Sequence, residues 1–186
     1  MIVIMESPDR CGKDTQIKLI KNRFPYFLFH ELHYTADLVN NPNLSIEEKF
    51  KISKNYYIEM FDIISSFSCY KNFILNRAHL GEYVYGKKYR GYDGSYVFDL
   101  EKKYKDFLYQ MKLIVFIDSA HNLISREDGE SLSGINIENK QEEIDKFIAA
   151  YEYSIIPKKK LINIDGKSIE QVCYEIFEFL FFNKEK

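Results

Sequence analysis

The sequence predicts an α/β domain in which a five-stranded parallel sheet is covered by helices on both faces. Five short apolar runs stand apart along the chain, with longer amphipathic stretches between them. That alternation is typical of parallel strands joined by crossover helices. A phosphate-binding pattern directly after the first apolar run fits the same fold. A length of 186 residues with 46% hydrophobic residues suits a single domain, residues 1–186, with a sizeable buried core.

The predicted strands are the five apolar runs, at residues 2–5, 26–29, 72–75, 113–117 and 160–164. Helical periodicity is clearest at residues 15–23, 46–67, 98–110, 142–153 and 168–181. Ser45 and Glu48 form a capping-box pattern, which marks the start of the second helix. Two segments that contain glycine, at residues 86–95 and 125–134, are predicted to be functional loops.

Charge and composition limit the partners of the chain. The net charge of −2 and the pI of about 6.1 do not supply the broad basic field with which proteins bind duplex DNA or anionic membranes. No apolar run approaches the length of a membrane span, and the first strand is too short for a signal peptide. We therefore expect a cytoplasmic protein with a small-molecule partner, no membrane partner, and nucleic acid only as an alternative.

Cysteine usage and overall composition add two further expectations. The cysteines are odd in number and lack C-x-x-C spacing, which argues against a zinc site and a disulfide framework and favours a reducing compartment. Lys, Asn, Ile, Tyr and Phe are abundant and Trp is missing, as is typical of an AT-rich genome. This composition suggests a phage, a virus or a low-GC bacterium, and for a virus the compartment would be the host cytoplasm.

The strongest functional signal follows the first strand, where residues 7–16 read S-P-D-R-C-G-K-D-T-Q. Backbone N–H groups at the start of a helix bind oxyanions, and Lys13 would place a positive charge against the β- and γ-phosphates of ATP. The alternative is a tight strand-to-helix turn in which Lys13 and Asp14 are merely solvated. The predicted ATP-binding residues of this loop are Ser7, Cys11, Gly12, Lys13, Asp14 and Thr15.

The loop departs twice from the standard pattern G-x-x-x-x-G-K-[ST]. Ser7 replaces the first glycine, and because Pro8 pushes it toward extended geometry, the position works only if no positive φ is needed there. Asp14 replaces the hydroxyl residue that usually contacts Mg²⁺. A carboxylate is a harder and more strongly charged ligand than a hydroxyl, so Asp14, or in part Thr15, is the predicted magnesium ligand.

This loop resembles that of thymidylate kinases, which commonly reads E-G-x-D-[RG]-x-G-K-[ST]-T-Q. The matching positions are Glu6, Asp9, Arg10, Gly12, Lys13, Thr15 and Gln16. The resemblance implies the P-loop nucleotide kinase fold with a lid segment. It also implies that Asp9 lies near the phosphate-accepting end of the acceptor and that Arg10 leans toward the transferring phosphoryl group, where it would stabilise developing charge.

A second block, residues 74–86, resembles the D-R motif of thymidylate kinases and the E-R-S motif of deoxynucleoside kinases. Arg77 matches these motifs and is predicted to bind a phosphate near the reaction centre. Asn76 stands where those families place a carboxylate. Since a carboxylate is missing at Asn76 and an unusual one is present at Asp14, we hypothesise that Asp14 takes over the negative charge that faces the metal.

A third block, residues 114–120, reads as the fourth strand and the turn after it, with Asp118 near the loop phosphates. The following residues resemble the lid of this superfamily, which closes over ATP and excludes water, and we expect the lid at about residues 125–140. Arg126 is predicted to bind ATP from the lid. A plain surface charge cluster with Glu127 and Asp128 is the alternative.

The acceptor site is the least defined part of the sequence. Phe61 and Tyr85 are predicted to contact the acceptor, although the spacing of the aromatic residues also fits core packing. Thymidylate kinases carry an arginine on the long second helix, and residues 46–68 contain none. Lys51 and Lys54 could replace it. The residues that follow the second strand and could read the acceptor's sugar or base are Glu31, His33 and Asp37.

Together these features predict a kinase that uses ATP and Mg²⁺ to phosphorylate a deoxynucleoside monophosphate, with dTMP as the first candidate. Its catalytic residues would be Lys13, Arg10, Asp9 and Arg77. One alternative is a deoxynucleoside kinase with Glu6 or Asp9 as the base. The others are a polynucleotide or modified-nucleotide kinase and a nucleotide-binding module without turnover. The resemblance alone implies a homodimer.

Overall fold

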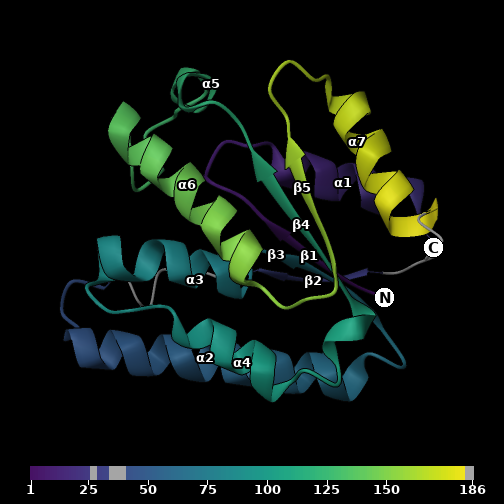
Figure 1. Ribbon diagram of the computed structural model, residues 1–186, viewed down its shortest axis with the longest axis horizontal. Coiled ribbons are helices and arrows are strands. Elements are labelled where there is room, and N and C mark those ends of the chain that lie inside the picture. Colours follow the sequence, from purple (N-terminus) through teal and green to yellow (C-terminus); the bar gives the residue numbers. More distant parts are fainter. Residues whose placement is uncertain (26–28, 34–40, 183–186) are drawn as a thin grey trace.

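The computed structural model of the chain describes residues 1–25, 29–33 and 41–182. It contains one parallel sheet with the strand order β2-β3-β1-β4-β5 (Figure 1). The predicted fold class, an α/β domain with five parallel strands, is therefore confirmed. The strands are β1 (Ile2–Glu6), β2 (Phe29–His33), β3 (Asn72–Asn76), β4 (Met111–Ile117) and β5 (Lys158–Asn163).

The second strand lies further along the chain than its apolar run predicted. We expected it at residues 26–29, whereas β2 begins at Phe29 and continues through His30 and Glu31. Residues 26–28 lie outside the described part of the chain. β2 is at the edge of the sheet and pairs with β3. An edge strand needs only partial apolar coverage, so its polar residues hid it from a search for apolar runs.

Helices cover both faces of the sheet. In Figure 1, α1 and α7 lie on one side of the strands, and α2, α3, α4 and α6 lie on the other. The long predicted helix at residues 46–67 is found with the same bounds as α2. The helices are α1 (Lys13–Arg23), α2 (Ile46–Phe67), α3 (His79–Tyr85), α4 (Tyr96–Lys103), α5 (Ala120–Ser125), α6 (Ile137–Tyr153) and α7 (Ile169–Phe177).

The side chains of β1 alternate between two hydrophobic cores. Ile2 and Ile4 point toward the core formed with α2, α3 and α6, whereas Val3 and Met5 point toward the core formed with α1 and α7. All four are completely buried. A strand covered on both faces reads as a continuous apolar run, which explains why β1 is visible in the sequence.

The capping box at the start of α2 is present as predicted. The backbone N–H of Ser45 donates to Glu48 Oε2 at 2.8 Å, and the N–H of Glu48 donates to Ser45 Oγ at 3.3 Å. We expect Ser45→Ala to lower the free energy of unfolding by about 1 kcal/mol, because it leaves an N-terminal N–H of α2 without its acceptor. Urea unfolding monitored by circular dichroism measures this change, and Ser66→Ala, on the exposed C-terminal turn of the same helix, is the control.

The glycine-containing segment at residues 86–95 is more ordered than the predicted loop. It begins with a π-helical turn, η2 (Gly86–Arg90), whose last residue, Arg90, is buried against the carboxylate of Glu82. Gly94 passes so close to α3 that a Cβ there would lie 2.2 Å from the carbonyl oxygen of Glu82. The segment therefore packs onto α3, and its glycine content serves close backbone approach.

One expectation about a helix was wrong, and one short helix was missed. The predicted helix at residues 98–110 is interrupted, because α4 ends at Lys103 and a separate 3₁₀ turn, η3 (Leu108–Gln110), leads into β4. The helix α3 was not predicted, since it is too short to establish a clear period. The last predicted helix ends as α7 followed by a π-helical turn, η4 (Glu178–Phe182).

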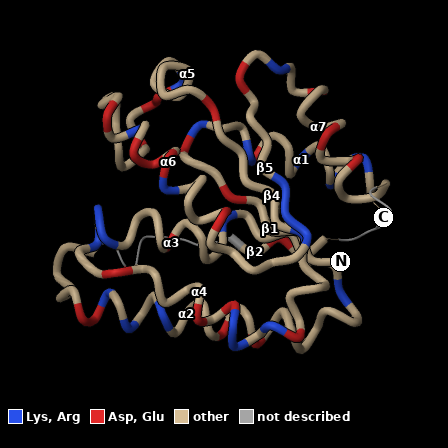
Figure 2. The backbone as a smooth tube through the Cα atoms, in the orientation of Figure 1, with Lys and Arg blue, Asp and Glu red and all other residues tan. Residues whose placement is uncertain are grey.

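Lysines at the start of β5 form a run of basic residues that is visible in Figure 2. Lys159 Nζ donates to the carbonyl oxygens of Tyr151 at 2.7 Å and Ser154 at 2.9 Å, at the C-terminal end of α6. Lys160 Nζ donates to the carbonyl oxygen of Glu175 in α7 at 3.3 Å. These ammonium groups satisfy carbonyl groups at or near helix ends, which is a structural role. In the described part of the chain, no helix combines the length and apolarity needed to cross a membrane.

Candidate active site

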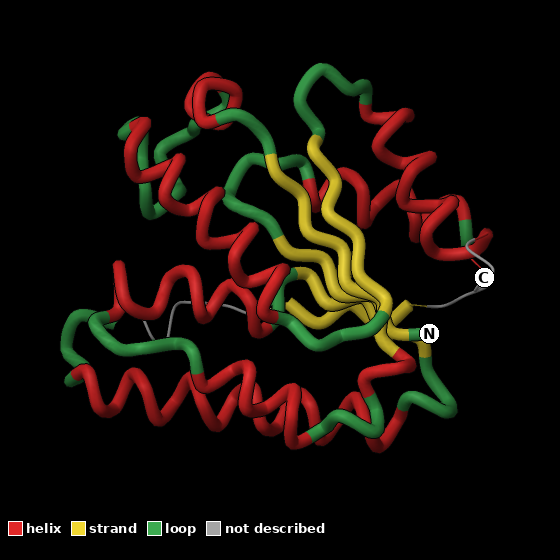
Figure 3. Tube along the Cα trace, viewed as in Figure 1, coloured by secondary structure: helices red, strands yellow, loops and turns green. Residues whose placement is uncertain are grey.

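Most of the predicted site residues lie on loops that leave the carboxyl ends of the strands. Figure 3 shows the loops of the chain in green. A pocket of about 370 Å³ lies at the end of β1 and is lined by residues 7–15 together with Arg77, Arg126 and Glu130. Open parallel sheets place their ligands at the carboxyl ends of their strands. The structure therefore brings residues from the loop, from the end of β3 and from the predicted lid to one pocket.

The backbone of the loop explains how Ser7 can replace the usual first glycine. Among the described non-glycine residues, positive φ values occur at Arg10 (70°) and Arg77 (67°), so Ser7 does not need one. Gly12 adopts φ 70° at the N-terminus of α1, where glycine is favoured. The left-handed backbone at the two arginines is costly for residues with a Cβ, and such strain often occurs at functional sites.

Lys13 is held inside the loop. Its side chain is 4% exposed, and its ammonium group contacts Asn76 Oδ1 and lies 3.4 Å from Asp14 Oδ1. Burial lowers the pKa of Lys13, and the positive charge of Arg77 lowers it further, whereas Asp14 and Glu6 oppose the shift. The buried ammonium group is therefore directed by an amide oxygen and by nearby carboxylates.

Asn76 connects the loop to the edge strand. Its Nδ2 group donates to Asp14 Oδ1 at 2.7 Å and to Glu31 Oε1 at 3.0 Å. Lys21 Nζ in turn donates to Glu31 Oε2 at 2.9 Å. Glu31 is one of three residues that could read the sugar or base of the acceptor, but in the structure its carboxylate joins the network of the phosphate-binding loop. That network depends on β2 lying beside β3, which no local pattern reveals.

The arginines of the pocket are each paired with a carboxylate. Arg77 contacts Asp9 and also lies 3.5 Å from the Tyr85 hydroxyl, through its Nη1. Arg10 contacts Asp128. In this conformation acidic side chains of the protein neutralise the arginine charges that would otherwise face a phosphate.

Arg126 joins the predicted lid to the phosphate-binding loop. Its guanidinium group contacts Asp118, and its Nη1 donates to the carbonyl oxygen of Arg10 at 2.8 Å. The side chain is 41% exposed, whereas that of Asp118 is 1% exposed. Arg126 lines the 370 Å³ pocket and also a neighbouring one of about 400 Å³. It therefore stands at the boundary between two hollows.

The neighbouring pocket lies between the start of α1, helix α5 and the turn that follows β5. Asn122 lines it, and its Nδ2 group donates to Asp118 at 2.8 Å and to Asp165 at 2.9 Å. Gly166 and Ile169 supply part of the opposite wall. Its position next to the phosphate-binding loop suits the nucleoside part of a bound nucleotide.

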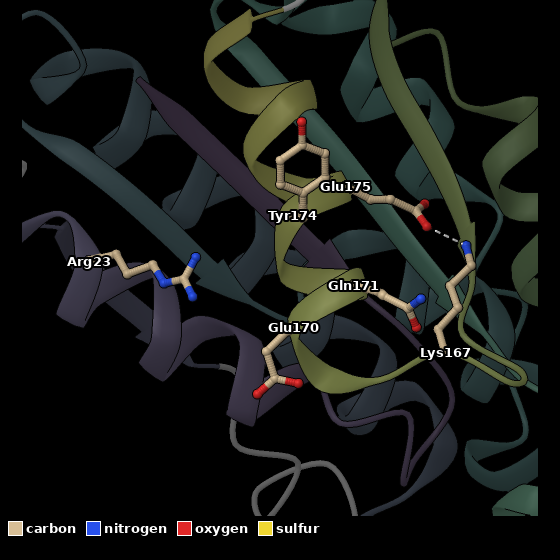
Figure 4. A pocket seen from close by; sticks show the side chains of 6 residues that line it. All are labelled: Arg23, Lys167, Glu170, Gln171, Tyr174 and Glu175. Atoms are coloured by element: carbon tan, nitrogen blue, oxygen red, sulfur yellow. Dashed lines mark ion pairs between the residues drawn. The ribbon is translucent and has the colours of Figure 1, made fainter.

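A hollow of about 530 Å³ lies elsewhere, over α7 and the end of α1 (Figure 4). Arg23, Glu170 and Tyr174 line it, and Lys167 pairs with Glu175 across 2.5 Å. It contains none of the loop residues that carry the phosphate-binding pattern, so size alone does not identify the site.

Glu6 is completely buried at the end of β1. Its Oε1 atom accepts hydrogen bonds from the backbone N–H groups of Ala78 at 2.9 Å, Leu80 at 3.0 Å and Gly81 at 3.4 Å. Burial raises the pKa of Glu6, although the backbone hydrogen bonds from Ala78 and Leu80 and the charge of Arg77 oppose the shift. Glu6 thus caps the start of α3 and holds the turn that presents Arg77.

The aromatic residues predicted to bind the acceptor occupy different places. The Phe61 ring is fully buried in the core and stacks on Tyr104 at a centroid distance of 5.1 Å. In this conformation it has no surface for a ligand, so the structure favours the core-packing alternative for Phe61. Tyr85 is 4% exposed, but its ring lies 5.7 Å from the Arg77 guanidinium, next to the pocket. Asp37, another acceptor candidate, lies outside the described residues.

The predicted lid is anchored to α6. Lys140 is completely buried, and its ammonium group donates to Glu127 Oε2 at 2.6 Å and to Ser131 Oγ at 2.7 Å. We expected a lid over residues 125–140, but α6 begins at Ile137, so the last part of that range is regular helix. The contacts of Lys140 with Glu127 and Ser131 therefore attach the segment after Arg126 to α6.

Asp14 has the chemistry of a magnesium ligand. Its side chain is 71% exposed, and it lines the phosphate pocket beside Lys13 and Thr15. Partial burial opposes ionisation, but Lys13 and Asn76 outweigh it and lower the pKa of Asp14, so its carboxylate is charged at neutral pH. Carboxylate and hydroxyl oxygens are the ligands that Mg²⁺ prefers. The described residues contain no group of three or more His, Cys, Asp or Glu side chains arranged to hold a metal alone.

The cysteines differ in exposure, and their reactivity therefore tests whether the phosphate-binding loop stays closed around Cys11 in solution. Cys11 and Cys173 are buried, whereas Cys69 is exposed. Burial, reinforced by Asp118, raises the pKa of the Cys11 thiol to about 12, and the thiolate is the reactive form. We expect iodoacetamide at pH 8 to modify Cys69 alone in the folded protein and all three cysteines in urea, as read by mass spectrometry. Rapid modification of Cys11 would show that the loop opens in solution.

No protein-family model matches the sequence, and no curated protein sequence matches it. Solved structures do match. Thymidylate kinase from Ehrlichia chaffeensis is 15% identical, with a TM-score of 0.67, over 97% of this chain and 98% of that one. Thymidylate kinase from Candida albicans is 14% identical, with a TM-score of 0.66, over 95% and 89%. The YorR protein from Bacillus subtilis, solved with phosphorylated GDP, is 16% identical, with a TM-score of 0.66, over 95% and 94%.

These likenesses extend over nearly the whole chain, and they agree with the strand order and with the position of the loop after β1. At such low identity they establish architecture, while the substrate has to be argued from the site. The chain therefore has the fold of the thymidylate kinase-like P-loop kinases.

Proposed function

We propose that the protein is a kinase that transfers the γ-phosphoryl group of ATP to a deoxynucleoside monophosphate, with Mg²⁺ as the metal ion. The single observation that carries this proposal is the pocket at the end of β1, where Lys13, Arg10, Arg77 and Arg126 converge around one phosphate-binding loop. Phosphoryl transfer is catalysed largely by positioning and by stabilising the charge on the transferring group, and these side chains supply both.

In the proposed reaction, the loop backbone and Lys13 bind the phosphates of ATP, and Arg126 contacts the donor from the lid. Asp14 and Thr15 would hold Mg²⁺, which would supply positive charge against the phosphates. Arg77 binds the phosphate of the acceptor, and Asp9 lies near its phosphate-accepting end. One oxygen of the acceptor phosphate attacks the γ-phosphorus as the bond to ADP breaks. Arg10 stabilises the charge that develops during transfer. The phosphates would displace Asp9 and Asp128 from the arginines with which they are paired.

A deoxynucleoside kinase is the second candidate, since residues 46–68 contain no arginine to bind an acceptor monophosphate. That activity needs a carboxylate to accept the proton of the attacking hydroxyl. Glu6 is buried and engaged by backbone N–H groups, so Asp9, with a side chain 22% exposed, is the better candidate for this base.

A coupled assay with ATP and Mg²⁺ tests the proposal. The acceptor panel contains dTMP, the other deoxynucleoside monophosphates, guanine nucleotides, the free deoxynucleosides and an oligonucleotide with a 5′-hydroxyl. The guanine nucleotides are included because the YorR structure holds phosphorylated GDP. Turnover on a monophosphate, dTMP above all, would support the proposal. Turnover only on nucleosides would favour the second candidate, and ATP binding without any transfer would indicate a non-catalytic module. The resemblance to thymidylate kinases also implies a homodimer, and light scattering coupled to size-exclusion chromatography tests this expectation.

A further inference from the structure

The two departures from the standard loop meet at one contact. Asn76 Nδ2 donates to Asp14 Oδ1 at 2.7 Å. In the standard arrangement the residue after the loop lysine is Ser or Thr, and the carboxylate that helps to hold Mg²⁺ comes from a strand. Here the carboxylate stands in the loop, at Asp14, and the neutral group stands at the end of β3, at Asn76. The negative charge thus stands on Asp14 instead of on residue 76, and one hydrogen bond joins the two side chains.

The hydrogen bonds of Asn76 explain why this position is neutral. Its amide oxygen faces the Lys13 ammonium group, and its NH₂ group donates to both Asp14 and Glu31. A carboxylate at position 76 could not donate either bond, and it would place three negative groups together at neutral pH. An amide at position 76 is therefore what permits a carboxylate at position 14.

Glu31 fixes the direction of that amide. Its Oε1 accepts from Asn76 at 3.0 Å, while its Oε2 is held by Lys21 at 2.9 Å. Because the amide nitrogen is bound on this side, the amide oxygen is directed at Lys13. Asp14, in contrast, keeps an exposed side chain that faces the phosphate pocket.

We propose that the loop and the strand have exchanged their charged and neutral residues: the metal-binding carboxylate stands in the loop, at Asp14, and a neutral polar residue stands on the strand, at Asn76. Asp14 is the carboxylate that binds the divalent cation of the nucleotide, and Asn76, oriented by Glu31, is a positioning residue. The inference rests on the proposed function only in that the loop binds a nucleotide with its metal ion.

The exchange can be reversed by mutation. The probe is Mn²⁺ in the presence of ADP, and the free ion is measured by electron paramagnetic resonance without any acceptor. Asp14→Ser should weaken Mn²⁺ binding about tenfold or more, in line with the usual effect of disturbing a metal site. The double variant Asp14→Ser/Asn76→Asp restores the standard arrangement and should recover most of that loss, an effect that additive mutations would not produce.

Two further variants separate a ligand from general electrostatics. Asp14→Asn keeps the shape of the side chain and should lose Mn²⁺ affinity as Asp14→Ser does. Glu130→Gln removes another carboxylate from the lining of the same pocket and should leave the affinity unchanged. Glu31→Ala should fall between wild type and Asp14→Ser, and Glu31→Gln should behave as wild type, because its amide oxygen still accepts from Asn76.

Three results would overturn the proposal: wild-type affinity in both Asp14 variants, a double variant as weak as Asp14→Ser while its melting temperature shows it to be folded, or an equal loss in Glu130→Gln. The assay contains no acceptor, so its result is separate from that of the substrate panel. Recovery of Mn²⁺ binding in the double variant would support the exchange even if no acceptor were phosphorylated.

Discussion

Replacing Lys13 by alanine is expected to lower kcat/KM for phosphoryl transfer by about a thousandfold, the size of effect seen when a group that stabilises transition-state charge is removed. The ammonium group is buried in the loop and held by the Asn76 amide oxygen, so water cannot easily take its place. The measurement is initial velocity with the best acceptor of the substrate panel. Circular dichroism would establish that the variant remains folded.

Lys71→Ala is the matched control. Lys71 is exposed and precedes β3 at the opposite edge of the sheet, so its removal changes the net charge equally without touching the pocket. We expect its kinetics to match those of wild type. Comparable loss in the two variants would indicate that total charge, rather than the group at position 13, governs the rate.

Replacing Lys140 by methionine is expected to lower the free energy of unfolding by about 3–5 kcal/mol, the usual cost of breaking a buried ion pair. Lys140 is completely buried, and the side chain of Glu127 is only 3% exposed. Without the ammonium group, the Glu127 carboxylate would stay buried and lose its strongest partner. Urea unfolding with an unchanged m value measures the loss.

Two variants give this prediction its contrast. Lys146→Met breaks a pair with Glu142 on the outer side of the same helix, at 2.8 Å, and should cost less than about 1 kcal/mol because that pair is solvated. The double variant Lys140→Met/Glu127→Met removes both charges and should be more stable than Lys140→Met alone. A double variant less stable than the single would contradict the account.

The pair of Lys140 and Glu127 should also make stability depend on pH in the acid range. Burial alone would raise the pKa of Glu127, but hydrogen bonds from Lys140 and Ser131 outweigh it and lower the pKa to about 2. A carboxyl whose pKa is lower in the folded state stabilises the fold at neutral pH, and that contribution is lost as the pH falls from the unfolded value toward the folded one. Wild type should therefore lose stability between about pH 4.5 and pH 2, and Lys140→Met should lose less over that interval.

The sheet and the phosphate-binding loop could be predicted because each depends on a pattern of residues that are adjacent in the sequence. Buried strands appear as apolar runs, and the loop appears as Gly12 and Lys13 directly after the first of them. The same search placed the second strand too early, since the edge strand β2 carries His30 and Glu31. Phe61 shows a second limit of sequence patterns. Helical spacing does not distinguish an aromatic residue that binds a ligand from one that fills the core.

Contacts between distant segments could not be predicted in the same way. Glu31 meets Asn76 only because β2 lies next to β3, and Lys140 meets Glu127 only because the segment after α5 turns back onto α6. The relation between Asp14 and Asn76 is visible in the sequence as one departure from each of two motifs, yet the hydrogen bond between them follows from the fold. Pairing of this kind is a property of the fold rather than of any window of sequence.

The carboxylates that accompany the arginines also affect how a nucleotide first meets the protein. Arg10, Arg77 and Arg126 face Asp128, Asp9 and Asp118, so their charges largely cancel before any ligand arrives. A cancelled charge exerts little attraction beyond its immediate neighbours, and diffusional encounter with an anion then gains little from electrostatic steering. The association rate of a nucleotide should consequently depend only weakly on ionic strength. Phosphate is then selected after contact, when the phosphate groups compete with the internal carboxylates for the arginines.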